Sequence, residues 1–185
     1  MSDFSNGKGI HTYTVQEAVN QHLGKVIHTT PGVLVGTTHA NDVMFDGIAE
    51  IENAVSYKGG TSRLVAISVT DYDIENHDFD IVFTQLGTYP LGSQGAAVTI
   101  TDADLKKENV LGTVRIDWSD YTIPMASRAS IITLGQGSTS TEVPLPILLQ
   151  AQSDSTSVFY QCVAREEADW AATSNLKFTF HIEYK

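Results

Sequence analysis

The chain has 185 residues, of which 42% are hydrophobic, and this is enough for one sizeable core with or without an extended arm. Its formal net charge of −11 argues against a nucleic-acid-binding surface, which would appear as a basic patch. No stretch approaches the roughly 20 apolar residues that a membrane span needs. We therefore predict neither a nucleic-acid partner nor a membrane partner.

The N-terminal part of the chain has the composition of an arm. Residues 1–13 are polar, contain glycine and show no hydrophobic periodicity, so we expect them to become ordered only against a partner. Thr14 and Glu17 have capping-box spacing, which predicts a short helix over residues 15–23 that stops at Gly24. We assign residues 1–36 to this arm with its helix, and residues 37–185 to a single β domain.

Two runs rich in β-branched and aromatic residues, 64–70 and 79–84, flank a polar, acidic connection. This arrangement is typical of an antiparallel hairpin. Both runs carry apolar side chains on both faces, which is typical of strands covered by layers on both sides. The sequence therefore predicts a hairpin at the centre of a sheet.

The second half of the chain adds one helix and several strands. Thr101 and Asp104 form a cap that predicts a short helix over residues 103–109. Strands are expected at 111–118, 129–134, 157–164 and 176–184, the last with strict alternation of apolar and polar residues. We expect an irregular or edge path over 121–125, an edge path over 145–150, and a helical turn or loop over 165–173. The fold class is thus mainly antiparallel β, a sandwich or jelly-roll-like domain with two short helices.

No stretch of the sequence carries a catalytic signature. Alternating carboxylates in residues 71–78 invite a calcium hypothesis, but Asn76 and Val82 replace the glycine and glutamate of an EF-hand loop. The six histidines lack zinc spacing, and Cys162 lies in an apolar run that predicts a buried, inert thiol. We therefore predict no catalytic, cofactor-binding or metal-binding residues.

The acidic charge is concentrated in one part of the chain. Residues 64–105 contain no lysine or arginine and carry seven carboxylates: Asp71, Asp73, Glu75, Asp78, Asp80, Asp102 and Asp104. Two interpretations remain open. The charge provides solubility and mutual repulsion of copies at high density, or it complements a basic partner.

Several short motifs follow one another in a characteristic order. They are Asp42-Val43, Asn53-Ala54-Val55, Gly59-Gly60-Thr61-Ser62 with Leu64, Ser68-Val69-Thr70-Asp71-Tyr72-Asp73, Asp80-Ile81-Val82-Phe83, Ile100-Thr101-Asp102-Ala103-Asp104 and Leu111-Gly112. Over about residues 40–115, this order resembles a group of structural proteins of tailed-bacteriophage virions. The chain departs from that pattern at Gln85 and Leu86, and in the turn of residues 74–77.

The resemblance implies a capsid decoration (cement) protein, which is not an enzyme and lies on the capsid exterior after synthesis in the host cytoplasm. Its implied partners are the major capsid protein and further copies of itself, as a homo-oligomer for which a trimer is one option. We expect the arm to clamp a neighbouring subunit, and the candidate partner-binding residues are Asp3, Phe4, Lys8, His11 and Tyr13.

Two alternatives remain open. The chain could serve elsewhere in the virion, in a tail, a head–tail connector or a fibre base. It could also be a carbohydrate-binding module that presents Trp170 or Tyr89 to a sugar, with Trp118 as a further candidate aromatic residue.

Overall fold

The structure is a computed structural model, and it describes residues 24–118, 123–125, 129–135 and 145–184. The described chain is mainly β, with antiparallel sheets and one helix, α2 (Asp102–Glu108). The predicted helix over residues 15–23 and the arm residues lie outside the described part. The predicted β class is confirmed.

Six strands form the larger sheet, in which β4 (Thr61–Asp71) is central. The order is β1 (Lys25–Thr29), β12 (Leu176–Tyr184), β4, β8 (Ala129–Gly135) and β7 (Ile123–Met125), and β9 (Ile147–Gln150) also pairs with β4. Residues 25–29, which the sequence analysis assigned to the arm segment, thus pair with β12 inside this sheet.

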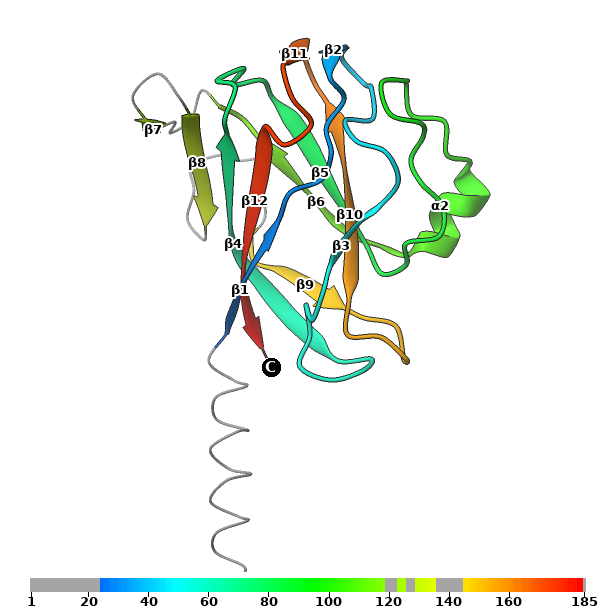
Figure 1. The fold of residues 1–185 in the computed structure, drawn as a ribbon. Helices are drawn as coiled ribbons and strands as arrows, with labels where there is room; N and C mark the ends of the chain where they lie inside the picture. Colours follow the sequence, from blue (N-terminus) through cyan, green and yellow to red (C-terminus); the bar gives the residue numbers. More distant parts are fainter. Residues whose placement is uncertain (1–23, 119–122, 126–128, 136–144, 185) are drawn as a thin grey trace, which may run out of the picture.

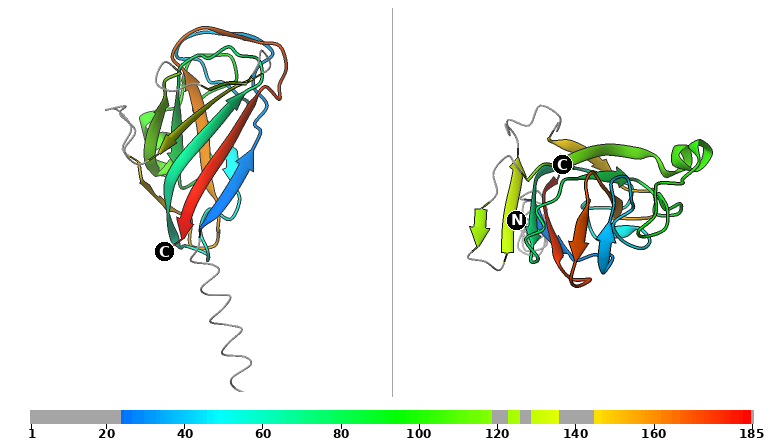
Figure 2. Two further views of the ribbon diagram at one scale, coloured as in Figure 1. Left: turned by 90° about the vertical axis from the view of Figure 1, so that its left-hand side faces the viewer. Right: turned by 90° about the horizontal axis from the view of Figure 1, so that it is seen from above.

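A second sheet faces the first. Its order is β3 (Ala49–Ile51), β10 (Val158–Ala164), β5 (Phe79–Thr84) and β6 (Val110–Ile116). A small third sheet joins β11 (Ala168–Trp170) to β2 (Gly36–Thr38) at one end of the molecule (Figure 1). Figure 2 shows the two larger sheets as facing layers, with α2 outside them.

The predicted hairpin is wrong, although both of its strands exist. β4 pairs with β12, β8 and β9, whereas β5 pairs with β10 and β6 in the opposite sheet. Residues 72–78 therefore cross from one sheet to the other. Each strand is central in its own sheet, which explains why both carry apolar side chains on two faces.

Among the other predicted elements, one helix and one strand pattern are confirmed, and one loop is partly wrong. The helix after Thr101 is confirmed, because the Thr101 side chain accepts a hydrogen bond from the Asp104 amide and Asn109 ends the helix in a left-handed conformation. The alternation in β12 is confirmed, with Phe178 and Phe180 buried between more exposed neighbours. The predicted helical turn or loop over 165–173 is wrong where β11 forms, since pairing with β2 imposes an extended backbone there.

Aromatic rings fill the space between the two larger sheets. The ring of Tyr160, on β10, lies 5.1 Å from the ring of Phe180 and 5.4 Å from that of Phe178, both on β12 of the opposite sheet. Its hydroxyl shares a 2.6 Å hydrogen bond with the hydroxyl of Thr29 on β1. Burial raises the pKa of Tyr160 well above its ordinary value, so the ring spans the core as a neutral phenol.

The substitution Tyr160→Phe should lower the free energy of unfolding by about 1–2 kcal/mol, because it leaves the Thr29 hydroxyl without its partner between the sheets. Chemical denaturation measures the change. Tyr184→Phe is the matched control, because the Tyr184 hydroxyl donates to the Asn53 carbonyl at an exposed site. An equal loss in both variants would contradict a special role for the Tyr160 bond.

Candidate functional site

The acidic connection between β4 and β5 is tied to the chain's own backbone. Asp71 is fully buried, and its carboxylate accepts hydrogen bonds from the amides of Asp73 at 2.8 Å, Ile74 at 3.0 Å and Asn76 at 2.9 Å. Burial outweighs these bonds and raises the pKa of Asp71. The loop is therefore organised by a carboxylate that the sequence analysis had considered as a calcium ligand.

Other carboxylates of the loop bind the segment around β11. Asp73 accepts from the Ala171 amide at 2.6 Å, and Glu75 accepts from the Asp169 amide at 2.9 Å. These two bonds fasten the connection across the end of the sheets, where β11 and β2 lie. No group of three or more metal-binding side chains occurs within the described ranges.

Three more carboxylates of the acidic interval have partners within the chain. Asp78 accepts from the Trp118 amide, Asp80 contacts the guanidinium groups of Arg115 and Arg165, and Asp104 contacts Lys107. Six of the seven carboxylates, all except Asp102, thus bond to other groups of the chain. Most carboxylates of the interval therefore hold segments of the chain together, a role that neither of the two interpretations from the sequence had considered.

One residue of this loop is a buried histidine. The imidazole of His77 packs on the ring of Trp170 at 4.8 Å and on that of Phe79 at 5.5 Å, and it is only 2% exposed. Neither of its ring nitrogens has a hydrogen-bond partner among the described residues. Burial lowers the pKa of His77 to about 4, so the ring is neutral at pH 7.

The aromatic candidates for sugar binding separate into two groups. Trp170 and Trp118 are 1% and 5% exposed, so the hypothesis that either presents its ring to a sugar is wrong. Tyr89 is half-buried, and the Lys107 ammonium lies 4.8 Å from the centre of its ring.

Cys162 is fully buried, as predicted, and burial raises the pKa of its thiol well above the ordinary value.

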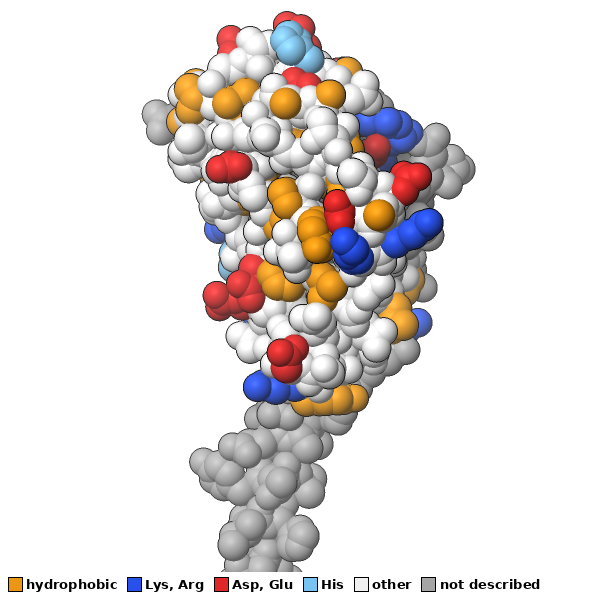
Figure 3. Space-filling model, turned by 90° about the vertical axis from the view of Figure 1, so that its right-hand side faces the viewer, with side chains coloured by type: hydrophobic (Ala, Val, Ile, Leu, Met, Phe, Trp, Pro, Cys, Tyr) orange, Lys and Arg blue, Asp and Glu red, His pale blue; other side chains and the backbone are white. Residues whose placement is uncertain are grey.

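Tyr89 borders a hollow on the face that carries α2. The hollow has a volume of about 360 Å³, and its lining includes Asp46, Ser93 and Asp104. On this face hydrophobic side chains gather in the middle, with acidic and basic side chains close by (Figure 3). The order of motifs in the sequence did not indicate this hollow, because its lining comes from separate loops and from α2.

A groove runs beside β1. It has a volume of about 450 Å³ and is lined by residues 25–29 together with Glu50, Glu52 and Asn53. β1 pairs with β12 on one side and ends the order of its sheet on the other. The predicted partner-binding residues, Asp3, Phe4, Lys8, His11 and Tyr13, all lie outside the described residues, upstream of this strand.

Replacing Asp71 by asparagine should loosen the loop, because an amide offers one acceptor oxygen where the carboxylate offers two. We expect the free energy of local opening at residues 73, 74 and 76 to fall by about 1–3 kcal/mol. Amide hydrogen exchange measures this quantity. Asp102→Asn, at an exposed position in the first turn of α2, is the control. If Asp71→Asn left exchange at these three amides unchanged, the role of the Asp71 carboxylate in holding the loop would be refuted.

The buried imidazole predicts a pH dependence of stability. The unfolded chain binds a proton on His77 below about pH 6.5 and the folded chain only below about pH 4, so stability is lost as pH falls through this window. The full loss is of the order of 3 kcal/mol.

Comparing the wild type with His77→Phe isolates this contribution, because the carboxylates that titrate in the same window, including Asp71, are common to both chains. The unfolding free energy of the wild type minus that of His77→Phe should fall as pH decreases from 6.5 to 4, because only the wild type loses stability through His77. A difference that is independent of pH would contradict the assignment. Urea denaturation at each pH supplies the measurement.

Comparison with known proteins assigns no family. No family model matches the sequence, and no curated protein matches it significantly. Within the described residues, no helix is long and apolar enough to cross a membrane. The resemblance to virion proteins thus rests on the order of its own motifs.

Proposed function

We propose that the chain is a non-enzymatic structural protein of a tailed-phage virion, of the capsid decoration type. In this proposal a β-sandwich or jelly-roll-like domain binds the lattice of the major capsid protein from outside, and an N-terminal arm clamps a neighbouring subunit. The protein acts as a homo-oligomer. Because it binds the assembled shell and not the separate subunits, binding stabilises the shell by mass action.

The residues that carry the resemblance have structural roles in this fold, which supports the proposal. Asp71 ties the loop between the sheets, and Thr101 caps α2. Gly60 closes a turn with a 2.9 Å hydrogen bond to the Tyr57 carbonyl, and a Cβ atom at this position would lie only 2.8 Å from that oxygen. These motifs specify the fold and carry no catalytic group, which is compatible with a structural role.

The observation that carries the proposal is the position of β1. It is an edge strand, and it lies beside an open groove of about 450 Å³. Edge strands present backbone donors and acceptors that another chain can use. Residues 1–23 precede this strand in the sequence, so an arm that reaches a neighbour would leave the domain at a surface suited to contacts between subunits.

Gly24 sets the direction in which the chain enters β1. Its φ is +88°, and a Cβ atom would lie 2.8 Å from the Ile182 carbonyl oxygen on β12. A side chain there would be strained and would push β1 away from β12. The chain can therefore enter β1 in this conformation only with glycine at position 24.

Deletion of residues 1–13 should reduce the occupancy of this protein on phage particles and lower the temperature at which the particles release their DNA. The deletion removes the proposed clamp and leaves the described domain intact. Quantitative mass spectrometry of purified virions measures occupancy, and a heat-release assay measures particle stability. A chain with residues 1–13 in scrambled order is the matched control for length and charge.

Unchanged occupancy and heat resistance after the deletion would overturn the clamp. The copy number of the intact protein tests the type of virion part. A number in proportion to the capsid subunits supports decoration, and a few copies per particle would assign the chain to a tail, connector or fibre base.

A carbohydrate-binding module remains the second candidate, because Tyr89 lines a hollow that also contains carboxylate and hydroxyl groups. Rings beside such groups are common in sugar sites. Binding to a glycan array that is lost in Tyr89→Ala would favour this candidate, and an array without hits would dispose of it.

A further inference from the structure

One residue of the loop between β4 and β5 has a backbone conformation that its type rarely adopts. Ile74 has a φ of +62°, in the left-handed region, where the branched Cβ of isoleucine crowds the backbone. Asparagine tolerates this region, and the other non-glycine residues with positive φ in the described ranges are all asparagine: Asn41, Asn53, Asn76 and Asn109. Isoleucine at position 74 is therefore strained, and strain of this kind clusters at functional sites.

Burial in the core does not explain this isoleucine. Ile74 is 38% exposed and the nearby Tyr72 is 50% exposed, whereas Val69 on β4 and Phe79 on β5 are fully buried. An apolar side chain left partly in water contributes less to folding than a buried one. The loop thus presents two apolar side chains to solvent, one of them at a conformational cost.

Hydrogen bonds hold the backbone of this loop in place. The amide of Tyr72 donates to the Asn175 carbonyl at 2.8 Å, and the amide of Asp78 donates to the Glu166 carboxylate at 2.8 Å. Between these two points, the Asp71 carboxylate accepts from three amides of the loop. A partner could therefore bind the two apolar side chains without first having to order the loop, which favours affinity.

Negative charge is concentrated at the same end of the molecule. Residues 71–78 and 165–175 carry seven carboxylates and a single basic residue, Arg165, which lies 3.2 Å from Asp80. Four of these carboxylates belong to exposed residues: Glu75, Glu166, Glu167 and Asp169. Bonds to the β11 segment place the loop at the end with β11 and β2, opposite to the end where the chain enters β1 (Figure 1).

This charge selects among the possible occupants of the surface. It repels nucleic acid, an anionic membrane and the same surface of a second copy, and it attracts a basic surface. A protein that combines apolar with basic groups is the occupant that complements both features of the loop.

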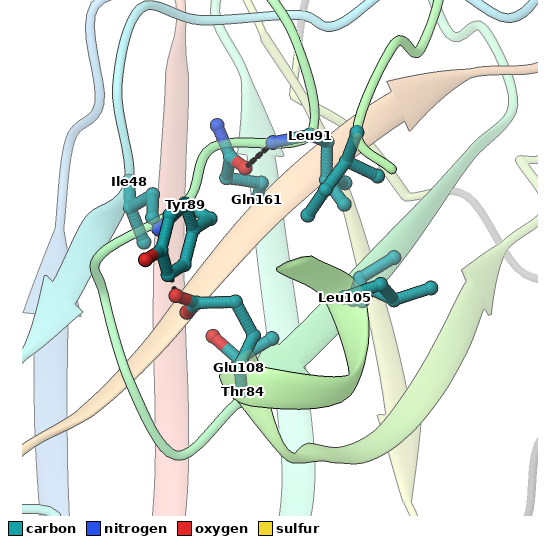
Figure 4. A pocket seen from close by; sticks show the side chains of 9 residues that line it. Ile48, Thr84, Tyr89, Leu91, Leu105, Glu108 and Gln161 are labelled. Atoms are coloured by element: carbon teal, nitrogen blue, oxygen red, sulfur yellow. Dashed lines mark hydrogen bonds between the residues drawn. The ribbon is translucent and has the colours of Figure 1, made fainter. Parts of the chain in front are cut away.

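The cavity beneath Tyr89 offers no comparable surface. It has a volume of about 10 Å³, which is too small for a side chain of a partner. Its lining includes Ile48, Leu91 and Leu105, which come from separate segments around α2 and β10 (Figure 4). The loop of residues 72–78 is open to a partner, whereas this cavity is not.

We propose that Tyr72 and Ile74 form a docking site for a protein whose surface combines an apolar depression with lysine or arginine side chains. The apolar contact supplies affinity, and the surrounding carboxylates orient the partner and speed its association. This site is separate from the groove beside β1, so the domain has contact surfaces at two opposite ends. The inference does not depend on a role in a virion.

A displayed library of repeat proteins with a randomised concave surface, selected on the full chain, probes the site. We expect the enriched binders to carry apolar and basic residues, and to bind Tyr72→Ser and Ile74→Asn about tenfold or more weakly than the wild type. Leu148→Ser removes an exposed apolar side chain from β9 and is the matched control, which should bind as the wild type does.

Three outcomes of this selection would overturn the proposal. They are the absence of enriched binders, binders without basic residues, and binders that both loop variants retain in full. Self-association of the wild type that is lost in Ile74→Asn would also overturn it, because the occupant would then be a second copy. Analytical ultracentrifugation measures self-association.

Salt and charge variants test the basic character of the partner. Binding should weaken as the ionic strength rises from about 0.05 M to about 0.5 M, because exposed charges are then screened. Asp169→Asn should slow the association of the binder, and Asp154→Asn, an exposed position in the loop before β10, should leave it unchanged. Binding that is independent of salt would contradict a basic partner.

The variant Ile74→Asn also tests the strain. Because asparagine tolerates the left-handed region, this variant should unfold at a higher urea concentration than the wild type while it binds the selected protein more weakly. Val110→Asn, at an exposed position of β6, is the control and should not gain stability. A lower urea midpoint in Ile74→Asn would show that isoleucine serves the fold, and the proposal would be wrong.

Discussion

The contact of Tyr160 with the opposite sheet holds the two layers in register. Its ring packs on Phe178 and Phe180, and its hydroxyl reaches Thr29 on the edge strand β1. A phenol suits this position because its ring supplies apolar area while its hydroxyl satisfies a polar group that the edge strand places inside. Beside the pairing of β1 with β12, this hydrogen bond adds a direct link from β1 to the second sheet.

The carboxylates serve the fold in a different way. At the end of the molecule formed by the loops of residues 72–78 and 165–173, side-chain oxygens from Asp73 and Glu75 accept hydrogen bonds from backbone amides. Charged acceptors form stronger hydrogen bonds with amides than neutral ones do. A chain with excess negative charge can therefore use its carboxylates to keep such connections ordered.

Local patterns predicted the strands well and their partners poorly. Alternation in residues 176–184 and the apolar runs of β4 and β5 follow from burial of one or two faces, which a sequence shows directly. Whether β5 pairs with β4 or lies in the other sheet depends on contacts with β10 and β12. These strands are 75 or more residues away in sequence, as the paired positions Ile81–Cys162 and Val69–Phe178 illustrate. The same limit applies to the candidate site, since the hollow at Tyr89 is lined by residues of separate segments. Asp71 was noticed for its charge, and its hydrogen bonds to backbone amides were not foreseen.

The single cysteine has a practical consequence for the study of assembly. Because Cys162 is fully buried and is the chain's only thiol, a thiol-directed label added to the folded wild type has no accessible target. A cysteine introduced at an exposed position would then be modified alone, which allows a fluorophore or cross-linker to be attached at one chosen place. The rate at which Cys162 itself is modified would report how often the core between the sheets opens.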